Sequence, residues 1–155
     1  DLSNLSRSMN SEMLLHNGLI RALEYEAGQL KKLDRYEINL LVTGNPVFLE
    51  GNTELVLFRI LQEAINNIIK HASATTIGIS LHYGSEALTM SVSDNGKGFH
   101  TSGNHPGSGL LNMKKRAALL KGSFHVTSTP NHSTQIKIEI PIYEKNNILQ
   151  THPRR

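Results

Sequence analysis

Four polar residues recur at helical spacing within the stretch F-R-I-L-Q-E-A-I-N-N-I-I-K-H-A, residues 58 to 72. Glu63, Asn67 and Lys70 stand at positions i, i+4 and i+7, and His71 lies near the edge of the same face. A carboxylate, an amide and an ammonium in this arrangement can meet a metal ion and the phosphates that it binds. The pattern also fits a solvated face, because any amphipathic helix has a polar side. The helix alone therefore leaves both interpretations open.

Two glycine clusters could bring the backbone close to an anionic ligand. Gly96 and Gly98 belong to D-N-G-K-G-F at the end of an expected strand, and Gly107 and Gly109 stand where a helix is expected to begin. Glycine permits close backbone approach, and the free N–H groups at a helix start favour anions. The ordinary alternatives are a turn after a strand and a flexible loop joined to a capped helix. The nucleotide signatures G-x-x-x-x-G-K-[ST] and G-x-G-x-x-G do not occur in the sequence.

Hydrophobic periodicity predicts the elements that must position these residues. Helices are expected over 1 to 33, over 54 to 72 with Thr53 as its cap, and over 109 to 121. Strands are expected over 37 to 42, 47 to 50, 77 to 83, 88 to 92, 124 to 128 and 135 to 140, with a mobile polar loop over 100 to 108. An α+β fold accounts best for this order: a two-layer sandwich of a mixed sheet with about three helices on one face.

Composition excludes several classes of protein. The 155 residues are enough for one domain with a core, and 38% hydrophobic with 19% charged residues is typical of a globular chain. No cysteine occurs, so disulfides and cysteine-based zinc sites are excluded. The net charge of +3 is scattered and forms no basic stripe for nucleic acid. No apolar run approaches the roughly 20 residues that cross a bilayer, and a start at Asp1 without Met suggests a piece of a longer protein.

The combined order of the motifs resembles the ATP-binding catalytic domain of bacterial sensor histidine kinases. These belong to the gyrase, heat-shock chaperone, histidine kinase and MutL superfamily, whose nucleotide-binding unit is the Bergerat fold. The resemblance covers roughly residues 35 to 142 and rests on the boxes E-x-x-x-N-x-x-K-H, D-N-G-K-G-F and G-S-G-L-L-N-M-K-K-R. It is greatest for the branch of nitrate and lipid-fluidity sensors. It implies that 1 to 33 end a dimerisation helix and linker, that 34 to 143 form the ATP-binding domain, and that 144 to 155 are a tail.

The resemblance also implies a role for each residue of the helical motif. Asn67 would coordinate Mg²⁺ through its amide oxygen, which suits a metal that keeps several waters. Glu63 would contact the water shell of the metal or polarise the attacking group. Lys70 and His71 would lie near the phosphates.

The remaining boxes are implied to hold the nucleotide. Asp94 would accept a hydrogen bond from the adenine amino group, with Thr134 assisting through a water, although Ser133 stands where the family often has glycine. Gly98 would leave room for the base. The other implied ATP-binding residues are Gly96, Gly107, Ser108, Gly109 and Leu110, of which Gly107 and Gly109 start a helix that closes over the phosphates.

The phosphoacceptor of such kinases, a histidine followed by an acidic residue, does not occur in this chain; His16 in L-L-H-N-G does not match. The chain is therefore expected to bind ATP and to deliver the γ-phosphate to a histidine on a separate dimerisation domain, upstream of a response regulator. The resemblance implies a cytoplasmic domain and allows a membrane anchor elsewhere in the full-length protein. Two alternatives stay open: an ATP hydrolase in which Glu63 activates water, and a nucleotide-binding regulatory module without catalysis.

Overall fold

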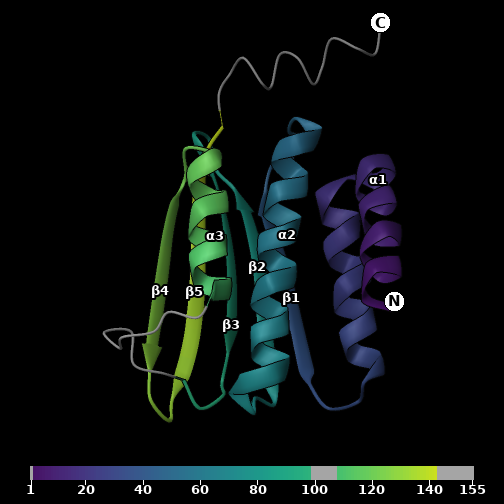
Figure 1. The fold of residues 1–155 in the computed structure, drawn as a ribbon. Coiled ribbons are helices and arrows are strands. Elements are labelled where there is room, and N and C mark those ends of the chain that lie inside the picture. Colours follow the sequence, from purple (N-terminus) through teal and green to yellow (C-terminus); the bar gives the residue numbers. More distant parts are fainter. Residues whose placement is uncertain (1, 99–107, 143–155) are drawn as a thin grey trace, which may run out of the picture.

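A mixed β-sheet forms one layer of the protein, and helices α1, α2 and α3 cover one of its faces (Figure 1). The structure is a computed structural model that describes residues 2–98 and 108–142. The elements in chain order are α1 (Leu2–Lys32), β1 (Glu37–Gly44), α2 (Gly51–Asn67), a π-helical turn η1 (Ile68–Ala72), β2 (Thr76–Tyr83), β3 (Ala87–Asp94), α3 (Ser108–Leu119), β4 (Ser123–Thr129) and β5 (Ser133–Pro141). The predicted two-layer α+β sandwich is confirmed.

The sheet has five strands in the order β1-β2-β3-β5-β4. β1 and β2 are parallel, and α2 with η1 forms the crossover that such a pair requires. The other neighbours are antiparallel. Burial alternates along β2, β3 and β5, so each strand turns one row of side chains toward the helices.

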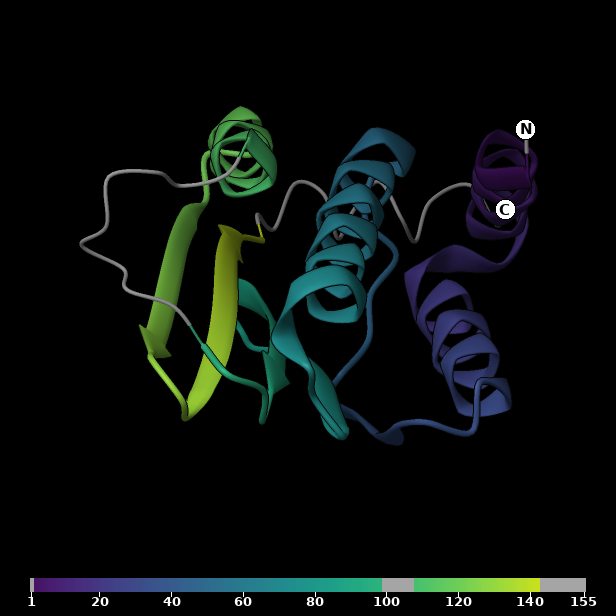
Figure 2. The ribbon, with the colours of Figure 1, turned by 60° about the horizontal axis from the view of Figure 1, so that its bottom comes forward.

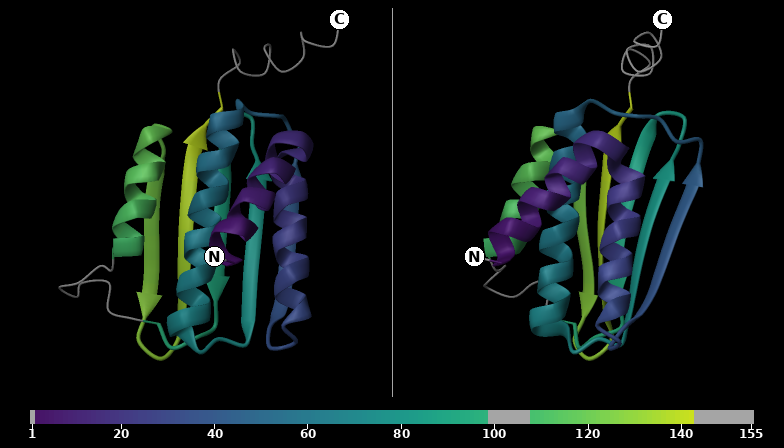
Figure 3. Two further views of the ribbon diagram at one scale, coloured as in Figure 1. Left: turned by 45° about the vertical axis from the view of Figure 1, so that its right-hand side comes forward. Right: turned by 90° about the vertical axis from the view of Figure 1, so that its right-hand side faces the viewer.

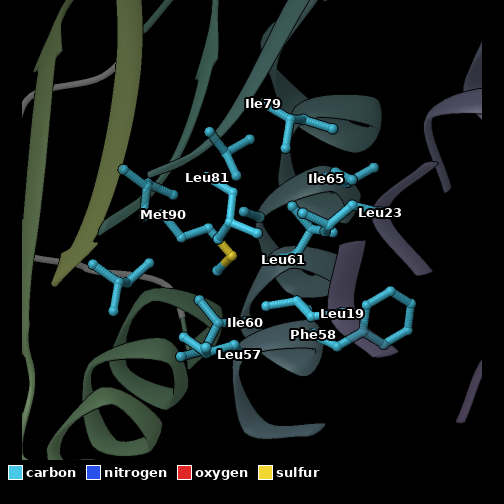
Figure 4. Packing of buried hydrophobic residues seen from close by; sticks show 14 of the residues in the cluster. Leu19, Leu23, Leu57, Phe58, Ile60, Leu61, Ile65, Ile79, Leu81 and Met90 are labelled. Atoms are coloured by element: carbon cyan, nitrogen blue, oxygen red, sulfur yellow. The ribbon is translucent and has the colours of Figure 1, made fainter. Parts of the chain in front are cut away.

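The core lies between α2 and the sheet (Figure 4). The apolar face of α2 that was predicted from periodicity is buried, with Leu57 and Leu61 at 1% and 0% exposure. These side chains pack in one cluster with Leu81 and Met90 from the sheet. Burying a leucine side chain stabilises a fold by about 1.5–3 kcal/mol. The packing therefore fixes which face of α2 is left for polar residues.

The start of α2 differs from the sequence prediction. The predicted strand over 47 to 50 is wrong, because these residues form no strand and the Leu49 N–H donates instead to the Glu54 carboxylate at 3.2 Å. The helix begins at Gly51 rather than 54, with Glu50 as N-cap and no side-chain capping bond. The prediction that Thr53 caps the helix is therefore wrong.

The end of α2 also differs. The predicted α-helix to Ala72 stops at Asn67, and the last turn widens into η1 before Ser73 takes a left-handed conformation with φ 53°. The other strands and α3 match their predictions within a few residues. The predicted mobile loop falls mainly on 99–107, and the predicted tail falls on 143–155, both outside the described residues. No helix in the described part of the chain has the length and apolarity to cross a membrane.

Candidate functional site

The polar face of α2 meets the start of α3. Glu63 and Asn67 are half-buried one turn apart, as their spacing predicts. A Cβ atom built on Gly109 would lie 2.8 Å from Glu63 Oε2 and 3.3 Å from Asn67 Nδ2. The backbone at the α3 start therefore lies directly against the carboxylate and the amide, and a Cβ atom there would push the Glu63 carboxylate aside. Gly109, the described member of one predicted glycine cluster, thus lies at the predicted polar face.

Lys70 and His71 follow in η1, where both side chains are exposed. Their predicted alignment with Glu63 assumed α-helical geometry through Ala72. In a π-helix each turn takes in more residues, so the direction of a side chain drifts from the α-helical expectation. Lys70 and His71 therefore lie beyond the regular α-helical face that carries Glu63 and Asn67.

Asp94 ends β3 as a buried carboxylate with 6% exposure. Its Oδ1 accepts a hydrogen bond from the Gly96 N–H at 2.7 Å, and within the described residues the carboxylate has no other hydrogen bond. Burial raises the pKa of the Asp94 carboxyl, and the bond from Gly96 opposes that rise only in part. The carboxylate thus has spare acceptor capacity in a poorly solvated place.

Thr134 stands opposite Asp94 on the neighbouring strand β5. Directly paired residues share a face of the sheet, with Cβ atoms about 4.5–5.5 Å apart. Thr134 is also buried, and its hydroxyl lies 2.8 Å from the hydroxyl of Ser128 on β4. Ser128 was not predicted as a site residue, because only the register between β4 and β5 brings it to Thr134.

The glycine after Asp94 fixes the strand end to the end of η1. A Cβ atom on Gly96 would lie 2.2 Å from the Ala72 carbonyl oxygen, and the Lys97 N–H donates to that same oxygen at 2.7 Å. The D-N-G segment is therefore more than a chain reversal. It joins the buried carboxylate of Asp94 to the helix that carries Asn67.

Asn95 makes a second connection at this edge. Its Oδ1 accepts hydrogen bonds from the N–H groups of Thr75 and Thr76, both at 2.9 Å, and its Nδ2 donates to the Thr75 hydroxyl. Sequence reasoning did not single out Asn95, since an asparagine before glycine is ordinary in a turn. Its three bonds hold the segment between η1 and β2 in place.

Gly98 lies close to the end of β4. Its φ is 63°, and a Cβ atom there would lie 2.2 Å from the Thr129 carbonyl oxygen. The backbone at the end of β4 therefore lies against Gly98 on the side where a Cβ atom would point. The room for a base that was predicted at this glycine stays a prediction. Glycine is needed here for the left-handed conformation and this close approach.

The remaining predicted site residues lie in or before α3. Leu110 is half-buried in its first turn, and Ser108 is its first residue. Gly107 lies outside the described residues. Groups of three or more histidine, cysteine or acidic side chains able to hold a metal do not occur in the part of the chain that the structure describes.

Comparisons with known proteins agree with this architecture. The chain is 40% identical over 92 residues to the signal transduction histidine-protein kinase/phosphatase DegS of Brevibacillus brevis, covering 59% of this chain and 24% of DegS. It is 37% identical over 92 residues to the sensor protein VraS of Staphylococcus epidermidis, covering 59% of this chain and 26% of VraS. The matched region thus spans about a quarter of the length of these relatives.

Solved structures share the fold. The histidine kinase domain of the blue-light activated kinase EL346 from Erythrobacter litoralis has a TM-score of 0.65 at 20% identity, covering 86% of this chain and 69% of that one. The histidine kinase AdeS of Acinetobacter baumannii has a TM-score of 0.65 at 18% identity, covering 90% and 77%. The pattern of one family matches residues 52–144, which is more than half of the chain. The chain therefore belongs to the family of histidine kinase-, DNA gyrase B- and HSP90-like ATPases.

Proposed function

We propose that this chain is the ATP-binding catalytic part of a sensor histidine kinase. It would hold Mg-ATP and deliver the γ-phosphate to a histidine on a dimerisation domain, which passes it to a response regulator in the cytoplasm. The observation that carries this proposal is the buried Asp94 carboxylate with spare acceptor capacity, tied through Gly96 and Lys97 to the helix that bears Glu63 and Asn67. Family membership and the kinase relatives support it.

Asp94 is proposed to select the base. Its free carboxylate oxygen would accept a hydrogen bond from the exocyclic amino group of adenine, while guanine presents a carbonyl oxygen there and would meet a like dipole. Thr134, held by Ser128, would place a water or its own hydroxyl beside this contact. The assignment predicts a clear preference for ATP over GTP.

Glu63 and Asn67 are proposed to face the phosphates. A carboxylate and an amide oxygen fit Mg²⁺, which prefers oxygen ligands and shares its coordination sphere with phosphates and water. When bound, Mg²⁺ would neutralise charge on the phosphate oxygens. Asn67 would hold the cation, Glu63 would orient its water shell, and the N–H groups at the α3 start beside Gly109 would receive phosphate oxygens. Lys70 and His71, exposed in η1, would add positive charge nearby.

Phosphotransfer is tested by supplying the missing acceptor. The part of DegS that precedes its matched region would be fused ahead of this chain and incubated with γ-labelled ATP. The fusion should become labelled with the acid-labile, base-stable chemistry of phosphohistidine, while the chain alone should remain almost unlabelled. Absence of label on the fusion, while intact DegS is labelled in parallel, would contradict the kinase assignment.

Glu63→Gln separates transfer from hydrolysis in the same assay. The substitution should reduce labelling of the fusion by about 10²-fold, because it removes a charged group beside the phosphates. The matched control is Glu86→Gln, at an exposed turn residue whose side chain makes no bond among the described residues. Rapid phosphate release by the unfused chain, abolished by Glu63→Gln, would favour the hydrolase alternative instead.

A further inference from the structure

Helix α1 is broken at Gly18. The glycine has φ 85° and ψ 175°, which no helix contains, so two helical pieces meet there at an angle. Figures 2 and 3 show the N-terminal piece leaving the rest of the domain in a different direction from the piece that follows. A Cβ atom at Gly18 would lie 2.7 Å from the Phe48 ring. The backbone conformation therefore favours glycine at this break.

The piece after the break belongs to the ATP-binding domain. Leu19, Leu23, Ala27 and Leu30 are at most 4% exposed and lie in the same core cluster as α2. Figure 4 shows Leu19 and Leu23 beside the α2 side chains. The residues after Gly18 therefore pack with the core, although they lie before the predicted boundary at 33/34.

One carboxylate holds the break together. Glu54 is 5% exposed, and its two oxygens accept separate backbone hydrogen bonds, from Leu19 at 3.2 Å and from Leu49 at 3.2 Å. The first bond satisfies the N–H that starts the second piece of α1, and the second bond fixes the segment before α2. Glu54 itself stands on α2, about two and a half helical turns before Glu63. It thus connects the break to the helix of the candidate site.

Packing around the break is loose. A cavity of about 210 Å³ opens there, lined by the 17–21 and 46–48 segments together with Glu54 and Tyr83. The Phe48 side chain against Gly18 is 55% exposed. Closely packed side chains would restrain the angle between two helical pieces. Here a cavity adjoins the break instead. The bond from the Leu19 N–H to Glu54 fixes the Gly18–Leu19 peptide unit directly at the break.

We propose that Glu54 is a positioning residue for phosphotransfer: its carboxylate fixes the direction in which the chain before Gly18 leaves the ATP-binding domain. The inference rests on the proposed kinase function. In such a kinase the N-terminal piece leads toward the dimerisation domain, so its angle sets where the γ-phosphate is presented. Substrate misplacement by about 1 Å costs up to about 10²-fold in rate. Loss of Glu54 should therefore slow transfer without weakening ATP binding.

Distances between spin labels test the joint directly. The chain has no cysteine, so pairs can be introduced freely. One pair, Ser8→Cys with Lys137→Cys, spans the break, and a reference pair, Gln29→Cys with Lys137→Cys, lies within the domain. Glu54→Gln keeps the size of the side chain but leaves only one oxygen to accept. It should broaden the distance distribution of the spanning pair and leave the reference pair unchanged.

The control and a second variant keep the test decisive. Glu50→Gln changes an exposed acid one helical turn earlier and should alter neither pair. Gly18→Ala cannot adopt φ 85° without strain and should move the spanning distance to a new value while the reference pair stays. An unchanged distance distribution of the spanning pair in Glu54→Gln, or equal broadening of both pairs, would overturn the proposal.

Kinetics distinguish this proposal from the function on which it rests. In the DegS fusion, Glu54→Gln should lower the rate of labelling at least about tenfold, while calorimetric affinity for Mg-ATP stays within about twofold of the parent chain. An unchanged labelling rate would overturn the positioning role and leave the kinase assignment standing. Failure of the parent fusion to label would contradict the kinase assignment, whereas the spin-label result would still decide the role of the joint.

Discussion

At the scale of single residues, Asp94 is the group proposed to set the selectivity of the site and its pH dependence. Burial raises the pKa of the Asp94 carboxyl above the value of about 3.9 that an ordinary aspartate has. Asp94 therefore takes up a proton at a higher pH than an ordinary aspartate does. The ionised form is the stronger hydrogen-bond acceptor. ATP affinity should be full above the raised pKa and should fall as pH is lowered through it. The position of Asp94 at the end of a strand could be predicted from the sequence. The burial that raises the pKa of its carboxyl could not.

Calorimetric titrations with ATP between pH 8 and pH 4.5 check this dependence. The parent chain should lose affinity toward the acid end, and Asp94→Asn should bind weakly with little further change. The ATP phosphates titrate equally in both experiments, so the difference between the two curves isolates Asp94. A parent curve parallel to that of Asp94→Asn would contradict the assignment.

Gly98 shows what residue types leave open. From the sequence, a glycine after a strand can make room either for a ligand or for a nearby backbone segment. In the structure, the Thr129 carbonyl lies against Gly98. The contact depends on the end of β4, which lies far along the chain. Ser128 and Asn95 escaped prediction for a similar reason, because their partners are set by strand register and by the turn after η1.

At the scale of elements, the start of α3 should be as important as the side chains of α2. Gly109→Ala would place a methyl group 2.8 Å from the Glu63 carboxylate and displace it. We expect at least about tenfold weaker Mg-ATP binding, since even small shifts of positioning groups are costly. Calorimetry on the folded variant measures this effect.

Gly28→Ala is the matched control for Gly109→Ala. It lies in α1, and a Cβ atom there meets nothing within 4 Å. The substitution should raise the free energy of unfolding by about 0.5–1 kcal/mol, the usual gain of alanine over glycine in a helix, and leave ATP affinity unchanged. Equal ATP binding by Gly109→Ala and Gly28→Ala would contradict the proposed role of the α3 start.

Helices and strands could be predicted where the hydrophobic periodicity of the sequence was strong. They could not where a side chain takes the backbone hydrogen bond that a neighbouring strand would otherwise make. The alternation in β2 and β3 and the apolar face of α2 are local patterns, and both were confirmed. The segment over 47 to 50 alternates as a strand would, yet Glu54 takes the Leu49 N–H that a neighbouring strand would need. The α2 helix ends in a π-helical turn whose last residue, Ala72, accepts a hydrogen bond from the Lys97 N–H, and no local pattern in the sequence indicates either feature.

At the scale of the whole molecule, the fold class followed from the order of helices and strands, while the site followed from motif order rather than from any single motif. The strand order β1-β2-β3-β5-β4 brings Asp94 and Thr134 into one register pair, and the α2 crossover brings Asn67 to the same domain face as α3. The angle at Gly18 was not predictable, because it depends on a carboxylate thirty-six positions later in the chain.

Calorimetric binding of Mg-ATP to the parent chain, Asp94→Asn and Asp34→Asn tests the central claim most directly. Asp34 is exposed and left-handed with φ 58°, a conformation that asparagine tolerates, so it is a matched control. A hydrogen bond to a charged group contributes about 1.5–3 kcal/mol, so Asp94→Asn should weaken ATP binding about 10- to 150-fold, while Asp34→Asn should bind as the parent does. Equal affinity of Asp94→Asn and the parent for ATP would contradict the account.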